Sequence, residues 1–375
     1  MPESTTPTMA AYHGGCVSNL VPALFGLMPG DWLPEPVRDA RAVVLFVIDG
    51  LGANAIDAMP DVVPTLASMT GSSITTVVPA TTSAALTSIT TGTTPSRHGI
   101  VGYRTMVERQ VLNVLRWQVE GGSGRGPVPS EVQRQSAFRG RLVPVLTKSE
   151  FKRSGFTAAH LGNGPFHGWK TPSVMIEHCR RLTHETREPL IYAYYPGVDE
   201  VAHEYGLRDG YYEAELRYVD SIVAQLLDVL PSDVALLVTA DHGQVHIEPD
   251  AWIDTLELAS LVQQQSGDAR FRHLHARDGS AKELLAECVS RYSSVAWVKS
   301  RKQLLDELWL GQAVAGVSPA GARVGDVVLM PFAPVGFIDP ALPKERGLRS
   351  AHGAPTAAEM MVPLRASRGQ APNRG

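Results

Sequence analysis

The chain has 375 residues, 44% of them hydrophobic and 19% charged, a composition typical of a globular protein with one large core or two domains. Its formal net charge of −4 argues against a stable nucleic-acid partner, because proteins that bind nucleic acids usually carry an excess of basic residues. Its three widely spaced cysteines argue against a disulfide framework. No apolar run reaches the ~18 residues of a membrane span and no secretion signal is visible, so we expect a cytoplasmic protein without a membrane partner.

Two strands and a helix are predicted in the first 100 residues. Residues 43–48 (VVLFVI) form a continuous apolar run before Asp49, which is typical of a strand buried on both faces of a parallel sheet. Residues 72–78 are rich in β-branched side chains and predict a second strand. After Pro79, residues 82–91 predict a helix that begins with a threonine, a residue favoured at helix N-termini.

Further strands alternate with helices up to about residue 245. We expect a hairpin over residues 103–118, a helix over 142–153 and a strand over 156–161. Two more apolar runs, 190–195 and 234–239, predict buried strands. This alternation predicts an α/β fold with a mostly parallel sheet.

The pattern changes after residue 245. Residues 246–346 mix predicted strands and helices in a different order, which we interpret as a smaller α/β cap inserted into the core. The core would then be discontinuous and comprise residues 16–245 and 347–368. The two ends, 1–15 and 369–375, would be flexible tails.

Polar side chains that can bind metal ions follow several of the predicted strand ends. They comprise three carboxylates, three imidazoles and one hydroxyl: Asp49, Thr82, Asp199, His203, Asp241, His242 and His352. Because the carboxyl ends of parallel strands meet at one edge of a sheet, we expect these side chains to lie together. Asp199 and His203 are four residues apart and would share one face of a helix. Ligands of these types suit zinc, with manganese as the second choice.

The turn after the first strand also half-matches a dinucleotide-binding fingerprint. Residues 50–55 (GLGANA) have the pattern G-x-G-x-x-A. However, Asp49 would repel a pyrophosphate at that turn. The acidic residue expected about 20 positions further on is also missing, since Met69 and Thr70 stand there. We therefore favour the metal site.

Several motifs, in this order, resemble the alkaline phosphatase superfamily, and most closely its nucleotide pyrophosphatase/phosphodiesterase branch. They are VIDGLG at 47–52, PATTSAALTSITTG followed by TTPSRHGI at 79–100, D-x-x-x-H at 199–203, TADHG at 239–243 and AHG at 351–353. The resemblance implies a three-layer α/β/α sandwich with an inserted cap.

The resemblance also implies two zinc sites and a nucleophile. One site would contain Asp199, His203 and His352, and the other Asp49, Asp241, His242 and the oxygen of Thr82. Thr82 matches the nucleophile of the family, and the neighbouring Thr81 is the second candidate.

General chemistry is consistent with this role for Thr82. A threonine hydroxyl is a poor nucleophile at neutral pH and needs activation. Zinc lowers the pKa of bound water from ~15.7 to about 7, and a threonine oxygen should respond similarly. A helix N-terminus would also direct free N–H groups at the phosphoryl oxygens. The sequence therefore predicts a two-metal hydrolase of phosphoric esters that forms a phospho-threonine, with a diester or pyrophosphate such as a nucleotide as substrate.

The substrate contacts are less defined than the metal ligands. Diesterases of this branch often present an asparagine shortly after the HGI motif, whereas Tyr103 and Arg104 stand there in this chain. Arg104 would equally favour a more charged monoester. Asn163 is a further candidate contact to the phosphate or the leaving group. A phosphomonoesterase, a phosphonate hydrolase and a phosphomutase-like metalloenzyme on the same scaffold are the alternatives.

Overall fold

A seven-stranded sheet forms the centre of the computed structural model, which describes residues 6–122, 126–185, 187–314 and 318–372. All seven residues of the central strand β1 are buried, as its continuous apolar sequence requires. Across the sheet the order is β2 (Thr70–Thr75), β18 (Met361–Arg368), β9 (Val234–Thr239), β1 (Ala42–Ile48), β8 (Leu190–Tyr195), β6 (Val145–Lys148) and β7 (Phe166–Trp169). Only β18 runs antiparallel to its neighbours.

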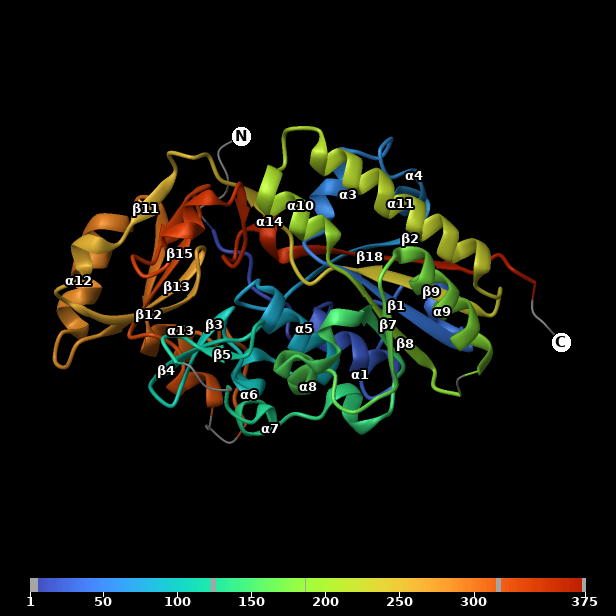
Figure 1. Ribbon diagram of the computed structural model, residues 1–375, viewed down its shortest axis with the longest axis horizontal. Coiled ribbons are helices and arrows are strands. Elements are labelled where there is room, and N and C mark those ends of the chain that lie inside the picture. Colours follow the sequence, from blue (N-terminus) through green and yellow to red (C-terminus); the bar gives the residue numbers. More distant parts are fainter. Residues whose placement is uncertain (1–5, 123–125, 186, 315–317, 373–375) are drawn as a thin grey trace.

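Helices cover both faces of this sheet (Figure 1). On one face, α5 (Thr82–Thr91) packs against α1 (Leu20–Leu24) and α8 (Gly155–His160). The other face carries a second group of helices: α3 (Ala53–Ala58), α4 (Pro64–Ser68), α9 (Pro172–Glu185), α10 (Gly197–Tyr205) and α11 (Tyr211–Val229). The predicted three-layer α/β/α fold with a mostly parallel sheet is confirmed. None of the described helices is long and apolar enough to cross a bilayer, and the cytoplasmic location stays a prediction.

The segment between residues 246 and 346 forms its own antiparallel sheet, at the left of Figure 1. Its order is β12 (Val262–Asp268), β13 (Phe271–Ala276), β15 (Val327–Pro331) and β14 (Ala296–Ser300). The helix α12 (Ala281–Tyr292) packs on this sheet. Two short antiparallel strands, β10 (Val245–His246) and β17 (Ser350–Ala351), join this cap to the core.

The sequence misassigned one stretch of the core. The helix expected over 142–153 is the strand β6 followed by a 3-10 helix, Ser149–Arg153, and the strand expected over 156–161 is the helix α8. A strand of four residues is too short to show its period in a sequence window, so its pairing with β7 and β8 decides the structure. The expected hairpin is present as a three-stranded sheet: β3 (Arg104–Val107), β4 (Gln110–Asn113) and β5 (Gln118–Val119).

Both ends of the chain are more firmly attached than the sequence suggested. The Thr8 amide donates to the Pro355 carbonyl at 2.8 Å, and the Tyr12 hydroxyl donates to the Trp309 carbonyl at 2.9 Å. At the other end, the Gln370 amide donates to the Leu227 carbonyl at 2.8 Å. The expectation of flexible tails is therefore wrong for residues 6–15 and 369–372, because hydrogen bonds hold their backbone. Residues 1–5 and 373–375 lie outside the described part of the chain.

A buried ion pair links the cap to the core. The Arg270 guanidinium, between β12 and β13, forms two 2.8 Å hydrogen bonds to the carboxylate of Glu359 in α14 (Ala357–Met360), and both side chains are fully buried. The guanidinium also donates to three carbonyls, those of Pro331, Ala333 and Val335. This pairing satisfies the Arg270 charge, which would otherwise be costly to bury.

We predict that Glu359→Ala lowers the free energy of unfolding by about 3–5 kcal/mol, because it leaves the Arg270 charge buried without its negatively charged partner. The matched control is Glu213→Ala, which breaks the exposed pair between Glu213 and Arg217 and should change stability far less. Urea unfolding of both variants measures the difference. Equal effects would show that the buried pair does not hold the cap.

Candidate active site

The carboxyl ends of three neighbouring strands place three acidic side chains together. Asp49 follows β1, Asp199 lies in the first turn of α10 after β8, and Asp241 follows β9. His203 is one turn along α10 from Asp199, and its Nε2 lies 3.3 Å from Asp199 Oδ1. His352 enters from the opposite direction, directly after β17. The predicted convergence of these segments therefore occurs at one edge of the sheet.

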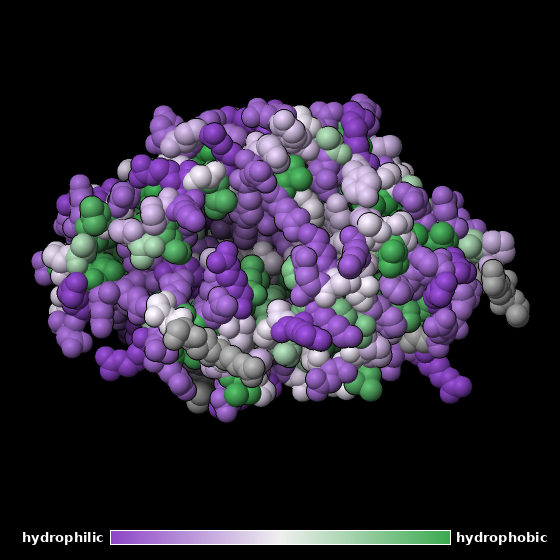
Figure 2. Space-filling view, in the orientation of Figure 1, coloured by the Kyte–Doolittle hydropathy of each residue, from purple (hydrophilic) through white to green (hydrophobic). Residues whose placement is uncertain are grey.

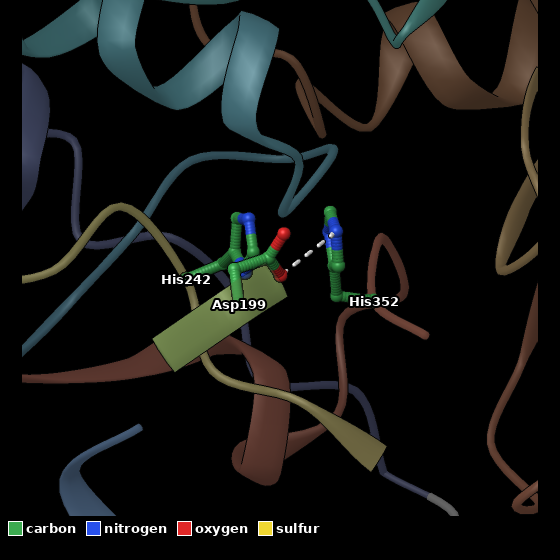
Figure 3. Close-up of side chains that lie close together, drawn as sticks. All are labelled: Asp199, His242 and His352. Carbon is green, nitrogen blue, oxygen red and sulfur yellow. Dashed lines mark ion pairs between the residues drawn. The ribbon is translucent and has the colours of Figure 1, made fainter. Parts of the chain in front are cut away.

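The acidic side chains and histidines form two overlapping groups of potential ligands. Ligand atoms of Asp49, Asp241 and His242 lie within 4.8 Å of one another, and so do those of Asp199, His242 and His352. Figure 3 shows the second group, in which His352 Nε2 is 3.8 Å from Asp199 Oδ1. His242 belongs to both groups, and its ring stacks on that of His352 with 3.5 Å between centroids.

Each of the three imidazoles is oriented by a backbone carbonyl. The Nδ1 atoms lie 2.8–3.1 Å from the carbonyl oxygens of Ser350, Ala80 and Gly243, for His203, His352 and His242 in that order. A carbonyl only accepts hydrogen bonds, so each Nδ1 carries the proton. Each Nε2 is therefore left with a free lone pair that faces the acidic cluster, as in metal-binding histidines.

The buried charges at this edge require compensation. Burial raises the pKa of Asp49 well above its ordinary value, and the nearby Asp241 and Asp199 raise it further. Burial likewise raises the pKa of Asp199 and Asp241, and lowers the pKa of His242 and His352, which favours neutral imidazoles. Asp49 Oδ1 and Asp241 Oδ2 are buried and have no hydrogen-bond partner in the part of the chain that the structure describes. These donor atoms fit divalent metal ions, which would supply the missing positive charge.

Thr82 is the first residue of α5 and faces this cluster. Its Oγ1 lies 3.1 Å from His242 Nε2, and it is partly exposed. The N-terminus of the ten-residue helix α5 adds free N–H groups and a positive dipole end at the same place. The neighbouring Thr81 is fully buried, and its hydroxyl has no hydrogen-bond partner among the residues that the structure describes. Thr82 is thus the accessible hydroxyl of the two.

Two hollows meet at Thr82, Asp199 and Leu115. The first is a cavity of about 220 Å³ with a largely apolar lining, which includes Leu86 and Phe156. The second is a cleft of about 750 Å³ between the core and the cap, with Tyr103 in its wall. Figure 2 shows the surface hollowed between the cap and the core, with hydrophilic residues around much of the rim. A ligand bound at Thr82 therefore has room on two sides.

Of the three expected substrate contacts, Tyr103 lies in the cleft, whereas Arg104 and Asn163 are placed where they cannot contact a substrate. Tyr103 lines the wider cleft. Arg104 does not face it freely, because its guanidinium is buried and pairs with Glu120 at 2.5 Å and Asp339 at 2.7 Å. Asn163 is exposed and lies three residues before β7, at the amino edge of the sheet and opposite the site. The expectations for Arg104 and Asn163 are therefore wrong. Arg104 is paired with acidic residues that are remote in the sequence, and Asn163 lies on the crossover to β7, at the edge of the sheet opposite the site.

Two side chains that orient the acidic cluster were missed by the sequence reasoning. The Tyr194 hydroxyl donates to Asp49 Oδ2, and the Gln244 amide donates to Asp199 Oδ1 at 3.0 Å. Gln244 also accepts a hydrogen bond from the Ser350 hydroxyl at 2.5 Å, and so connects α10 to the segment that carries His352. Gln244 directly follows the TADHG motif, and that position was the available signal.

We predict that zinc stabilises the chelator-treated chain. Zinc at about 100 times its dissociation constant should add about 2.7 kcal/mol to the free energy of unfolding and raise Tm. Asp241→Asn and His242→Ala should lose most of this shift, whereas His184→Ala, which removes an exposed histidine on α9, should retain it. Thermal unfolding with and without zinc tests this, and elemental analysis should find two ions per chain. A Tm that is insensitive to zinc would contradict the metal site.

Comparison with known proteins agrees with this geometry. The sequence matches the family model of type I phosphodiesterases / nucleotide pyrophosphatases over residues 43–354, although no curated protein sequence matches the chain. Murine ectonucleotide pyrophosphatase/phosphodiesterase 5 superposes with a TM-score of 0.66 at 15% identity over 88% of each chain, and its inactive variant has been solved in complex with AMP. Phosphonoacetate hydrolase from Sinorhizobium meliloti 1021, in complex with phosphonoformate, gives a TM-score of 0.60 at 18% identity over 88% of this chain and 91% of that one. The chain therefore belongs to the type I phosphodiesterase / nucleotide pyrophosphatase family and is a phosphodiesterase-type hydrolase of phosphoric esters.

Proposed function

We propose that this chain hydrolyses a phosphodiester or pyrophosphate, such as a nucleotide, through a covalent intermediate on Thr82. The observation that carries the proposal is that the accessible Thr82 hydroxyl lies beside two groups of buried metal-ligand atoms, at the point where two hollows meet. The AMP complex of the murine relative supports a nucleotide as the substrate class.

The ligand atoms divide between two divalent ions, with zinc favoured over manganese because imidazoles and carboxylates are combined. One ion would be held by Asp199, His203 and His352, and the other by Asp49, Asp241, His242 and Thr82 Oγ1. When bound, the two ions would supply positive charge to the attacking and leaving oxygens of an in-line displacement.

The residues of the chain account for the remaining steps. Thr82 gives up its hydroxyl proton to solvent as Oγ attacks phosphorus. The Oγ–P bond forms, the bond from phosphorus to the leaving oxygen breaks, and the leaving group takes up a proton from solvent. The N–H groups at the start of α5 stabilise the charge on the phosphoryl oxygens. Water then attacks the phospho-threonine, the P–Oγ bond breaks and Thr82 regains its proton. Two inversions give net retention of configuration at phosphorus.

The shape of the site supports a diester over a monoester. A diester carries a group on each side of its phosphorus, and the apolar cavity and the wider cleft provide a space for each. Arg104, which would favour the dianionic phosphate of a monoester, is committed to Glu120 and Asp339. We assign an aromatic or apolar group to the cavity lined by Leu86 and Phe156.

The wider cleft suits an anionic group on the other side of the substrate. Arg116 and Lys344 line this cleft and are exposed, and neither has an ion-pair partner within the described ranges. The acids nearby are largely neutralised, since Glu120 pairs with Arg104 and Glu345 with Arg272 at 2.6 Å. The free charges at the rim are therefore mostly positive, which favours a phosphate chain or carboxylate there.

We predict that Thr82→Ala lowers turnover of bis-p-nitrophenyl phosphate by at least ~10³-fold, since it removes the nucleophile. Thr81→Ala, the adjacent control, should stay close to wild type because its hydroxyl is buried away from the hollows. Steady-state rates with zinc and with chelator measure both effects. Comparable activity of Thr82→Ala and wild type would rule out the assigned nucleophile.

We also predict faster turnover of bis-p-nitrophenyl phosphate than of p-nitrophenyl phosphate by the wild-type chain. The apolar cavity holds one aryl group while the second departs through the wider cleft. Measurement of kcat/KM for both esters, with phosphonoacetate as a third substrate, separates the alternatives. A higher kcat/KM for the monoester or for phosphonoacetate would replace the diesterase proposal by the corresponding activity.

A further inference from the structure

Tyr103 is held at three points in the wall of the wider cleft. Its N–H donates to Oδ2 of Asp268, a buried carboxylate of the cap, at 3.0 Å. Its carbonyl accepts from the Val114 amide at 2.8 Å, and its phenolic oxygen accepts from Nδ2 of Asn113 at 2.5 Å. Two of these hydrogen bonds hold the backbone of Tyr103 and the third holds its phenolic oxygen, so the residue is preorganised before any ligand binds.

The hydrogen bond between Asn113 and Tyr103 has a defined direction. The Arg116 amide donates to Asn113 Oδ1 at 3.0 Å, and a backbone N–H can only donate. The carbonyl side of the Asn113 amide must therefore face Arg116, and its NH₂ group must face Tyr103. Asn113 is 8% exposed, so it has little freedom to turn round. It follows that the phenolic oxygen is the acceptor and that its own proton is available to another group.

No residue in the described ranges accepts this phenolic proton, and Tyr103 lines the same cleft as Thr82, Ser83 and His352. A phenol that accepts one hydrogen bond becomes a better donor of the next, because the two bonds polarise each other. The nearby Arg104 does not compete for a ligand in the cleft, since Glu120 and Asp339 occupy its guanidinium. The available donor on this wall of the cleft that also contains Thr82 is thus neutral and preorganised.

We propose that Tyr103 donates its phenolic hydrogen bond to a phosphoryl oxygen of the substrate, and that Asn113 is the positioning residue that keeps this proton directed into the cleft. This inference rests on the proposed hydrolysis at Thr82 and specifies how the non-bridging oxygen is held. A neutral donor suits the single negative charge of a phosphodiester. It strengthens as charge builds on that oxygen in the transition state, so its effect falls mainly on kcat.

The variants of Tyr103 and Asn113 follow an order that only this arrangement predicts. Tyr103→Phe removes the hydroxyl alone and should lower kcat for bis-p-nitrophenyl phosphate by about 10- to 100-fold, the effect of a hydrogen bond to a charged oxygen. Asn113→Ala removes the hydrogen bond to the phenolic oxygen but provides no acceptor for the phenolic proton. It should therefore lower kcat less than Tyr103→Phe does. Asn113→Asp cannot donate to the phenolic oxygen, and its carboxylate accepts the phenolic proton instead. The kcat of Asn113→Asp should therefore be as low as that of Tyr103→Phe. The kcat of the double variant Tyr103→Phe/Asn113→Asp should be no lower than that of Tyr103→Phe.

Tyr211→Phe is the matched control, because Tyr211 is exposed on α11. Thermal unfolding of every variant identifies losses caused by instability. Calorimetric binding of bis-p-nitrophenyl phosphate to Thr82→Ala, with and without Tyr103→Phe, gives a second measurement that needs no turnover, and the phenylalanine variant should bind more weakly.

The outcomes separate this inference from the proposed function. If Thr82→Ala loses activity and Tyr103→Phe keeps it, the role of Tyr103 is overturned while the proposed hydrolysis at Thr82 stands. Asn113→Asp that is more active than Asn113→Ala would also overturn it, because the direction of the hydrogen bond would then not matter. A wild-type chain that neither binds nor hydrolyses the diester would overturn both.

Discussion

Asp49 and Asp241 are buried, and Asp199 is half-buried, side by side at the carboxyl edge of the central sheet. Their mutual repulsion and their loss of water both disfavour the charged forms. The backbone of the sheet fixes the acids, since each follows one of three adjacent parallel strands. The surrounding hydrogen bonds satisfy only some of their oxygens, and Asp49 Oδ1 and Asp241 Oδ2 receive none from any described residue. Divalent cations are the partners that this arrangement requires. The hydroxyl of Thr82 and the N-terminus of α5 are placed against the same charges.

The cap completes this edge of the sheet rather than merely covering it. His352 lies directly after the strand β17, by which the chain returns from the cap to the core. Asp268 of the cap holds the backbone of Tyr103, and the buried pair of Arg270 and Glu359 joins cap and core below the cleft. A shift of the cap would therefore displace His352 and a wall of the cleft together. The position of the cap thus affects the proposed metal site as well as the shape of the cleft.

Charge pairing in the cleft wall determines which groups can meet a substrate. Arg104 and Arg272 are buried and paired with Glu120, Asp339 and Glu345. This pairing removes Arg104, the cation that the sequence assigned to phosphate binding. Arg116 and Lys344 line the cleft and have no ion-pair partner among the described residues. If Tyr103 contacts the phosphoryl oxygen as proposed, the site would combine a neutral donor at phosphorus with positive charge at the rim, which would favour diesters with an anionic substituent.

The sequence alone was sufficient for the central strands and for the mostly parallel α/β fold. It was also sufficient to predict that seven side chains lie together: Asp49, Thr82, Asp199, His203, Asp241, His242 and His352. The physical reason is that a buried parallel strand needs a continuous apolar run, and parallel topology brings whatever follows each strand to one edge. The tertiary structure decided the rest. Strand β6 is too short to show a period, and Asn163 lies at the wrong edge because a crossover returns the chain there. Arg104 pairs with Asp339, which is 235 residues away in the sequence, and the Tyr103 amide donates to Asp268, which is 165 residues away. Local pattern carries no information about such distant partners, so only packing could show that Arg104 is paired and that the backbone of Tyr103 is held by the cap.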